Sequence, residues 1–207
     1  MLTVHHLNES RSQRILWLLE ELSVPYDIKF YQRDPQTRLA PPELKAVHPL
    51  GKSPVITDNG ETIIESGAIV DYIIRKYGNG RLQPAPNSPE YTPYVEWLHY
   101  AEGSAMLPLL LKLYTGRLGE GGAPLQPRID SEIANHLGYI DNALAGREYL
   151  LGDLTGADIQ LSFVGEIAGA FGQRANHPNM DAWVKRFQAR PAYKAALERG
   201  GPYPLAD

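Results

Sequence analysis

The pattern of apolar residues changes once along the chain, near residue 80. Before that point, short strand-like runs alternate with helical periods, and after it only helical periods occur. Alternating strands and helices build a sheet covered by helices, whereas a run of helices builds a bundle. We therefore expect an α/β domain at residues 1–78, a Gly- and Pro-containing linker at 79–88, and an all-helical domain at 89–207.

Two strands and a helix are predicted in the first 31 residues. An opening strand is marked by Leu2, Val4 and Leu7, and the period becomes helical at Arg11. Pro25 ends that helix. The helix turns one apolar face inward: Ile15, Leu18, Leu19 and Leu22. In the next strand, inward and outward residues alternate. The residues expected inside are Tyr26, Ile28 and Phe30, and those expected outside are Asp27, Lys29 and Tyr31.

A β-hairpin is predicted at residues 55–64. Asn59-Gly60 separates two short apolar runs, and both residues tolerate the positive φ of a tight turn. A further helix begins near Gly67. The first strand–helix–strand connection implies a parallel pair, and the hairpin implies an antiparallel pair. We therefore expect a mixed four-stranded sheet flanked by helices.

The second half is predicted to contain several amphipathic helices. The first is long and bent at Pro108, and the expected inward residues are Tyr94, Leu98, Ala105, Leu109 and Leu113. Glu102 falls on the same stripe, and residues 116–127 are expected to form a Gly-rich loop. Shorter helices are expected at 129–144, 155–171, 180–189 and 193–197. Thr155 and Asp158 have the spacing of a capping box, which places a helix start at that point.

Composition excludes several classes of function. A net charge of −4 gives no electrostatic reason to expect a nucleic-acid partner. The chain has no cysteine, so disulfides, thiolate nucleophiles and Cys-bound metals are impossible, and a reducing, cytoplasmic location is expected. The opening residues lack a signal-peptide pattern, no apolar run reaches membrane-spanning length, and no histidine pair has helical metal-binding spacing.

Three short segments carry the chemistry: Asn8–Ser12, Gly51–Val55 and Glu65–Gly67. Each has a plain structural interpretation. A serine of the first segment can be a helix N-cap, Pro54 can start a strand, and Glu65-Ser66 can be an acidic cap for the next helix.

Together these segments resemble the cytosolic glutathione S-transferases. His48–Pro54 resembles the His/Asn-Pro-x-Gly-Lys-x-Pro motif of that family, and Glu65–Ile69 resembles its Glu-Ser-x-Ala-Ile motif. Thr155–Ile159 resembles the family's C-terminal capping box, and Pro178–Tyr193 resembles its closing helices. The opening Ser10–Arg14 and the segment Tyr100–Ser104 are similar to a fungal and bacterial serine-type branch.

The resemblance implies a thioredoxin-like N-terminal domain, an all-helical C-terminal domain and glutathione as cosubstrate, with no metal. It implies a cis Ser53–Pro54 bond, with the Ser53 backbone on the cysteinyl part of glutathione. Glu65 and Ser66 would then hold the γ-glutamyl end and Lys52 the carboxylate side. Arg33 and Arg38 are weaker candidates for the glycine end. A small hydrophobic electrophile would bind between the domains, above the sulfur.

Ser10 is the expected partner of the glutathione sulfur. A free thiol has a pKa of about 8.5, so an enzyme must favour the thiolate at neutral pH. A serine hydroxyl is too weak a base to remove the proton, but it can donate a hydrogen bond to the anion. Asn8 and Ser12 remain alternatives, because the turn can be shifted by two residues.

The resemblance also implies a two-fold homodimer in which Glu102 lies near the partner's glutathione ammonium. The plain alternative is that Glu102 lies in water at the edge of its apolar stripe. The competing function is a non-catalytic glutathione-transferase-like binding or scaffold protein. A thiol-disulfide reductase of the same fold would need a cysteine, which this chain lacks.

Overall fold

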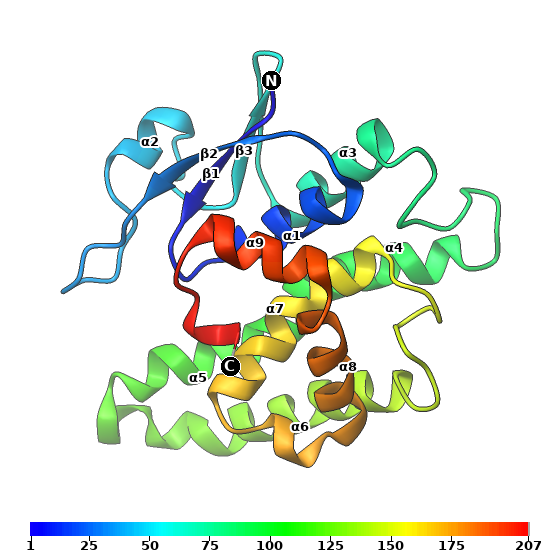
Figure 1. Cartoon of the computed structure of the whole chain (residues 1–207). Helices are drawn as coiled ribbons and strands as arrows, with labels where there is room; N and C mark the ends of the chain where they lie inside the picture. Colours follow the sequence, from blue (N-terminus) through cyan, green and yellow to red (C-terminus); the bar gives the residue numbers. More distant parts are fainter. Residues whose placement is uncertain (207) are drawn as a thin grey trace. The chain divides into compact units, whose positions relative to one another are not determined.

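The computed structural model describes residues 1–206, which form two compact units. The first unit contains Met1–Gln83 and the residues from Phe187 on, and the second contains Pro84–Arg186. The domain limits at residues 78 and 89 stay a prediction. The structure places the last helix with the first unit, whereas the sequence pattern grouped it with the helical region (Figure 1).

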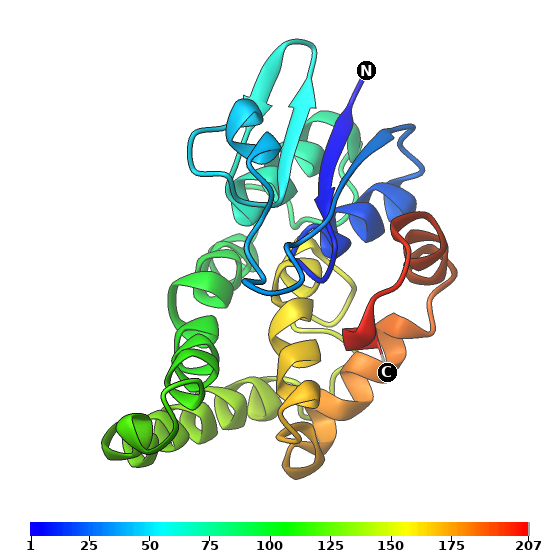
Figure 2. The same cartoon turned by 90° about the vertical axis from the view of Figure 1, so that its left-hand side faces the viewer.

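A four-stranded mixed sheet forms the centre of the first unit, as predicted. Its strands are β1 (Thr3–Leu7), β2 (Asp27–Tyr31), β3 (Val55–Asp58) and β4 (Glu61–Ile63), in the order β2-β1-β3-β4. β1 is parallel to β2 and antiparallel to β3, and β3 is antiparallel to β4. The β3–β4 hairpin is visible in cyan in Figure 2. This arrangement confirms the thioredoxin-like class expected for the N-terminal part.

The strand register brings three chain segments to one edge of the sheet. β1 ends beside the end of β2, since Leu7 pairs with Tyr31. β3 begins beside the second half of β1, where Val55 pairs with His5. β4 ends beside the beginning of β3, because β3 and β4 are antiparallel. The residues after β1, before β3 and after β4 therefore leave the sheet at the same edge, which is the one formed by the C-terminal ends of β1 and β2.

Helix α1 (Gln13–Leu22) is buried nearly all round. Eight of its ten residues are buried, including Leu16 and Trp17, which lie outside the expected apolar face. The reason is α9 (Pro191–Gly200), which packs along α1 (Figure 1). Trp17 stacks on Phe187 with ring centroids 5.1 Å apart. A helix covered on several sides needs apolar residues on several sides.

The inward and outward residues of β2 differ from the expected alternation at its end. Tyr31 is buried and Phe30 is 55% exposed, so the prediction that Phe30 lies inside and Tyr31 outside is wrong. The Tyr31 hydroxyl forms a 2.9 Å hydrogen bond with Nδ1 of His5. A buried polar partner on β1 thus accounts for the position of Tyr31, and residue type alone does not reveal it.

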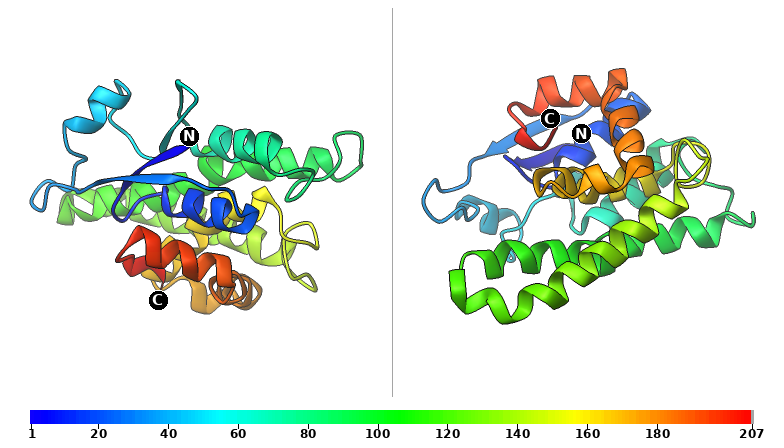
Figure 3. Two further views of the ribbon diagram at one scale, coloured as in Figure 1. Left: turned by 45° about the horizontal axis from the view of Figure 1, so that its top comes forward. Right: turned by 90° about the horizontal axis from the view of Figure 1, so that it is seen from below.

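Helices make up the second unit, which confirms the all-α class of this part. α5 and α6 lie side by side (Figure 3). The Gly-rich segment expected to be a loop contains a 3₁₀ helix. The remaining elements of the chain are α2 (Glu43–Val47), α3 (Ser66–Tyr77), α4 (Tyr91–Tyr100), the π-helix η1 (Ala101–Ala105), α5 (Met106–Gly116), the 3₁₀ helix η2 (Gly119–Leu125), α6 (Gln126–Ala143), α7 (Gly156–Ala170), η3 (Arg174–Asn176), α8 (Pro178–Gln188) and η4 (Pro204–Ala206).

The long helix is interrupted by a π-helical turn rather than by a simple bend. The Met106 amide donates to the Ala101 carbonyl, five residues earlier. Pro108 follows closely and has no amide hydrogen for the Ser104 carbonyl, so an α-helical ladder cannot continue through this region. The extra residue in the turn also shifts the buried stripe. Leu113, expected inside, is 40% exposed.

The capping box at the start of α7 is confirmed. The Thr155 side chain accepts backbone hydrogen bonds from the first turn, and Asp158 Oδ2 accepts from the Thr155 amide at 2.9 Å. Asp158 is fully buried and also accepts from the Leu150 amide and from Nε1 of Trp183. The cap therefore holds a preceding loop and α8 as well as its own helix. No helix within residues 1–206 has the length and apolar character needed to span a membrane.

Candidate functional site

The turn between β1 and α1 contains two serine hydroxyls in direct contact. Oγ of Ser10 lies 2.7 Å from Oγ of Ser12, and the Ser12 amide donates to Oγ of Ser10 at 3.2 Å. Ser12 occupies the N-cap position of α1, yet its side chain makes no capping hydrogen bond. The plain interpretation of Ser12 as an N-cap therefore does not hold, and its hydroxyl has other partners.

Ser53 brings a second segment to this turn. Oγ of Ser53 is an acceptor within reach of Oγ of Ser10, at a long distance of 3.4 Å, and Oγ of Ser53 itself donates to the His5 carbonyl at 3.0 Å. The Ser53–Pro54 peptide bond is cis, as expected, and Pro54 is buried. Two of the three chemically informative segments thus meet through their side chains.

His6 is a site-adjacent residue that the sequence did not single out. Its side chain is buried, and Nδ1 lies 2.9 Å from Oγ of Ser12. Burial lowers the pKa of His6 to about 4, so the ring is neutral at pH 7. Successive residues of a strand point to opposite faces, so His5 and His6 diverge, but no local signal pairs His6 with Ser12.

The third segment lies at the start of α3, at the same edge of the sheet. Ser66 is the first residue of α3 and is buried, while Glu65 just before it is exposed. Glu65 has a φ of 65°, a conformation that residues other than glycine rarely adopt. Strained residues of this kind are concentrated at functional sites. Lys52, two residues before the buried Pro54, is exposed.

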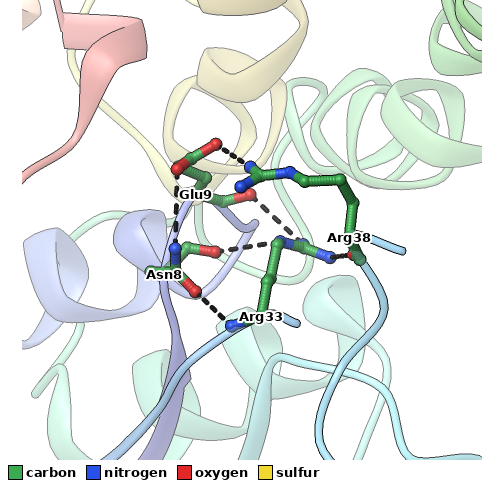
Figure 4. A network of polar contacts seen from close by, with 4 residues as sticks. All are labelled: Asn8, Glu9, Arg33 and Arg38. Carbon is green, nitrogen blue, oxygen red and sulfur yellow. Dashed lines mark hydrogen bonds and ion pairs between the residues drawn. The ribbon is translucent and has the colours of Figure 1, made fainter. Parts of the chain in front are cut away.

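Asn8 belongs to a network that ties the β1–α1 turn to the segment after β2 (Figure 4). Its Oδ1 accepts from the Arg33 amide at 2.8 Å, and its carbonyl accepts from Nε of Arg33 at 3.1 Å. Arg33 also donates to the carbonyls of Glu9 and Arg38, and the Arg38 side chain forms an ion pair with Glu9. The polar groups of Asn8, Arg33 and Arg38 are thus used to hold this turn.

Family models and curated relatives match most of the chain. The model "Glutathione S-transferase, N-terminal domain" matches residues 1–75, and "Glutathione S-transferase, C-terminal domain" matches residues 97–191. Glutathione S-transferase 3 of Schizosaccharomyces pombe is 35% identical over 96% of this chain and 88% of its own length. The chain belongs to the glutathione S-transferase family. Glutathione S-transferase 1 of Saccharomyces cerevisiae is 29% identical over 96% of this glutathione transferase and 95% of its own length.

Solved glutathione transferases have the same fold. A glutathione S-transferase from Actinobacillus pleuropneumoniae superposes with a TM-score of 0.90 at 33% identity, covering 100% of this chain and 96% of its own. A family member from Pseudomonas fluorescens, solved with two glutathione bound, superposes with a TM-score of 0.80 at 27% identity. The match covers 95% of this chain and 92% of that one. These relatives support glutathione transferase activity and do not favour the non-catalytic alternative.

The other candidate residue, Glu102, lies in the second unit of this glutathione transferase. It is half-buried within the π-helix η1. Its neighbour Ala101 is fully buried, so Glu102 lies at the margin of the buried stripe. Within residues 1–206, no group of three or more His, Cys, Asp or Glu side chains is arranged to hold a metal ion.

Proposed function

We propose that this glutathione transferase is of the serine type and that Ser10 stabilises the thiolate of bound glutathione. The observation that carries the proposal is the contact of Ser10 with Ser53, which joins the start of α1 to the segment before β3. Oδ1 of Asn8 already accepts a hydrogen bond from the Arg33 amide, and Ser12 is completely buried with its Oγ on His6. Both arrangements favour Ser10 over these two neighbours.

The strength of this stabilisation can be bounded. A hydrogen bond to a charged group contributes about 1.5–3 kcal/mol, and the positive end of a helix adds roughly 0.3–1 kcal/mol. One pKa unit corresponds to about 1.36 kcal/mol, so the sum lowers the thiol pKa by roughly one to three units. Such a shift gives a substantial thiolate population at neutral pH. The thiolate then attacks a small hydrophobic electrophile.

The ends of glutathione are assigned to the neighbouring segments. Glu65 takes the γ-glutamyl ammonium, while the hydroxyl and amide of Ser66 at the start of α3 take the γ-glutamyl carboxylate. The backbone of Ser53, before Pro54, pairs with the cysteinyl part, as one more strand added to an edge. Lys52 serves the carboxylate side as an exposed positive charge. The convergence of these segments at one sheet edge supports the assignment.

A homodimer in which Glu102 approaches the partner's glutathione ammonium is also proposed. The half-buried position of Glu102 in η1 supports an interaction with a charged group, because a carboxylate at the margin of a buried stripe needs solvent or a partner. Sedimentation that shows a fully active monomer would exclude this arrangement. The cytoplasmic location expected from the sequence stays a prediction.

The experiment compares three alanine variants in a spectrophotometric conjugation assay with a broad electrophile. Ser10→Ala is expected to lower turnover at least tenfold, with a smaller effect on glutathione affinity, because the hydrogen bond to the anion is lost. Asn8→Ala and Ser12→Ala are expected to stay within several-fold of the parent. Full activity in Ser10→Ala, together with loss in either neighbour, would contradict the assignment.

A further inference from the structure

A chain of hydrogen bonds runs inward from Ser10. Oγ of Ser10 lies 2.7 Å from Oγ of Ser12, which in turn lies 2.9 Å from Nδ1 of His6. Ser10, Ser12 and His6 are all buried, at 4%, 0% and 3% exposure. Bulk water therefore does not compete for these bonds.

The chain has a fixed direction, because each hydroxyl has a single hydrogen. Oγ of Ser12 donates to the Leu7 carbonyl at 3.3 Å, and Nδ1 of His6 lies 2.9 Å from the same Oγ on the inner side. The Ser12 hydrogen is therefore directed away from Ser10. For its own hydrogen Ser10 has Oγ of Ser12 at 2.7 Å and Oγ of Ser53 at 3.4 Å, and the shorter distance favours Ser12 at rest.

We propose that His6 and Ser12 tune the bound thiolate by competing, through this one-way chain, for the hydrogen that Ser10 donates to sulfur. The proposal rests on the proposed role of Ser10. His6 and Ser12 act through Ser10, so they are positioning residues rather than catalytic ones. When the thiol loses its proton to solvent, the Ser10 hydrogen turns from Oγ of Ser12 to the sulfur, and one neutral hydrogen bond is exchanged for a charged one.

The competition raises the thiol pKa above the value that an unopposed Ser10 would produce. A less acidic thiol gives a more reactive anion, since the intrinsic nucleophilicity of a thiolate falls as its pKa falls. The best attacking thiol has a pKa near the ambient pH. The chain from His6 therefore balances the amount of thiolate against the reactivity of each thiolate.

The test is the pKa of the thiol in the complex of the enzyme with glutathione, followed by the ultraviolet absorbance of the thiolate. In Ser12→Ala the sulfur no longer competes with Oγ of Ser12 for the Ser10 hydrogen. The thiol pKa is therefore expected to fall by about 0.5–1 unit. Ser53, at 3.4 Å, remains as a weaker acceptor that keeps Ser10 in place. An unchanged or raised thiol pKa would overturn the proposal.

The pH–rate profile provides a second readout that a merely structural change does not produce. With a slow electrophile, Ser12→Ala is expected to be faster than the parent at acid pH, because more thiolate is present. At alkaline pH it is expected to be up to about threefold slower, because each thiolate is less nucleophilic. The two profiles should cross. A uniform loss at every pH would contradict the proposal.

Two further variants separate the possible failures. Ser12→Cys preserves the volume with a much weaker hydrogen-bonding group and should give a smaller shift of the same sign if Ser12→Ala fails to fold. In the Ser10→Ala background, Ser12→Ala should have no effect on the thiol pKa. If Ser10→Ala alone leaves that pKa unchanged, the proposed function fails. If Ser10→Ala raises it but Ser12→Ala does not lower it, only the tuning chain fails.

Discussion

The starts of α1 and α7 both bury polar side chains, but the two helix starts are built differently. At α7, Asp158 accepts hydrogen bonds from the amides of Leu150 and Thr155 and from Nε1 of Trp183. At α1, Ser10 and Ser12 share one hydrogen-bonded chain that ends at His6. One carboxylate is surrounded by donors in the first case, whereas several acceptors compete for one hydrogen in the second.

This difference separates a structural cap from a chemical site. A buried acceptor that receives several hydrogen bonds has one best arrangement, and changing it leaves donors without partners. A hydroxyl chain with fewer hydrogens than acceptors has a second arrangement close in free energy, so a bound anion can redirect it. The α7 start is therefore expected to respond to mutation in stability, and the α1 start in activity and pH dependence.

The largest expected effect is at the α7 start. Asp158→Ala should lower the free energy of unfolding by about 4 kcal/mol, because several buried donors lose their acceptor at once. Urea unfolding of the full chain measures this change. The exposed Asp153, five residues earlier, supplies a matched control, since Asp153→Ala should change stability by about 0.5 kcal/mol or less. Equal effects of the two substitutions would remove the distinction between the helix starts.

At the α1 start, the next largest effect is a dependence of the free energy of unfolding on pH. Burial lowers the pKa of His6 from 6.5 to about 4, so the unfolded chain binds its proton more readily than the folded chain. The stability contribution of neutral His6 is fully present above pH 6.5. It is lost as the pH falls toward 4, by about 3 kcal/mol in total.

The measurement is unfolding free energy at several pH values between 7 and 4, for the parent and for His6→Asn. The variant should show a shallower decline, because asparagine has no proton to gain in this range. All other titrating groups are common to both proteins, so the difference between the curves isolates His6. Parallel curves would show that His6 does not contribute to the acid sensitivity.

A smaller effect extends the comparison to the start of α3. Glu65→Ala and Ser66→Ala should each weaken glutathione binding by roughly tenfold, because the charged γ-glutamyl end loses a partner. Calorimetric titration with glutathione provides the affinity. Glu61→Ala, in the exposed end of the hairpin, is the control and should bind normally. Unchanged affinity in both test variants would exclude this segment from the binding site.

The smallest expected effect concerns the cap of α7. Thr155→Ala should reduce stability by about 1 kcal/mol, because it removes the side-chain acceptor for the first turn while Asp158 keeps its other bonds. Chemical unfolding again supplies the value. A loss as large as that of Asp158→Ala would mean that Thr155, rather than the carboxylate, organises this helix start.

Local pattern was sufficient to predict the sheet, the hairpin and the α7 cap. Each depends on residues close in sequence: Asn59-Gly60 sets the hairpin turn, and Thr155 and Asp158 are three residues apart. The motif segments at Ser10, Ser53 and Glu65 were also found, because their residue types are distinctive. Their convergence at one edge follows from the strand register, which the sequence only implied.

Long-range contacts account for what local pattern did not predict. Trp17 lies off the expected face because residues from 187 on pack over α1, and nothing near Trp17 in sequence indicates this cover. His6 meets Ser12 across the β1–α1 turn, and no apolar pattern indicates this contact. The π-helix before Pro108 depends on backbone hydrogen bonding rather than on apolar spacing.

The split of the first unit between the two ends of the chain has a consequence for synthesis. Its core includes Trp17 packed on Phe187, and Pro84–Arg186 lies between its two parts in sequence. At about 5–20 residues per second, a ribosome needs on the order of 5–20 seconds to make that intervening stretch. During this interval the apolar surface of α1 that α9 later covers has no partner from its own unit. The nascent chain therefore exposes an aggregation-prone apolar helix during this interval, and a chaperone that binds apolar segments would protect it.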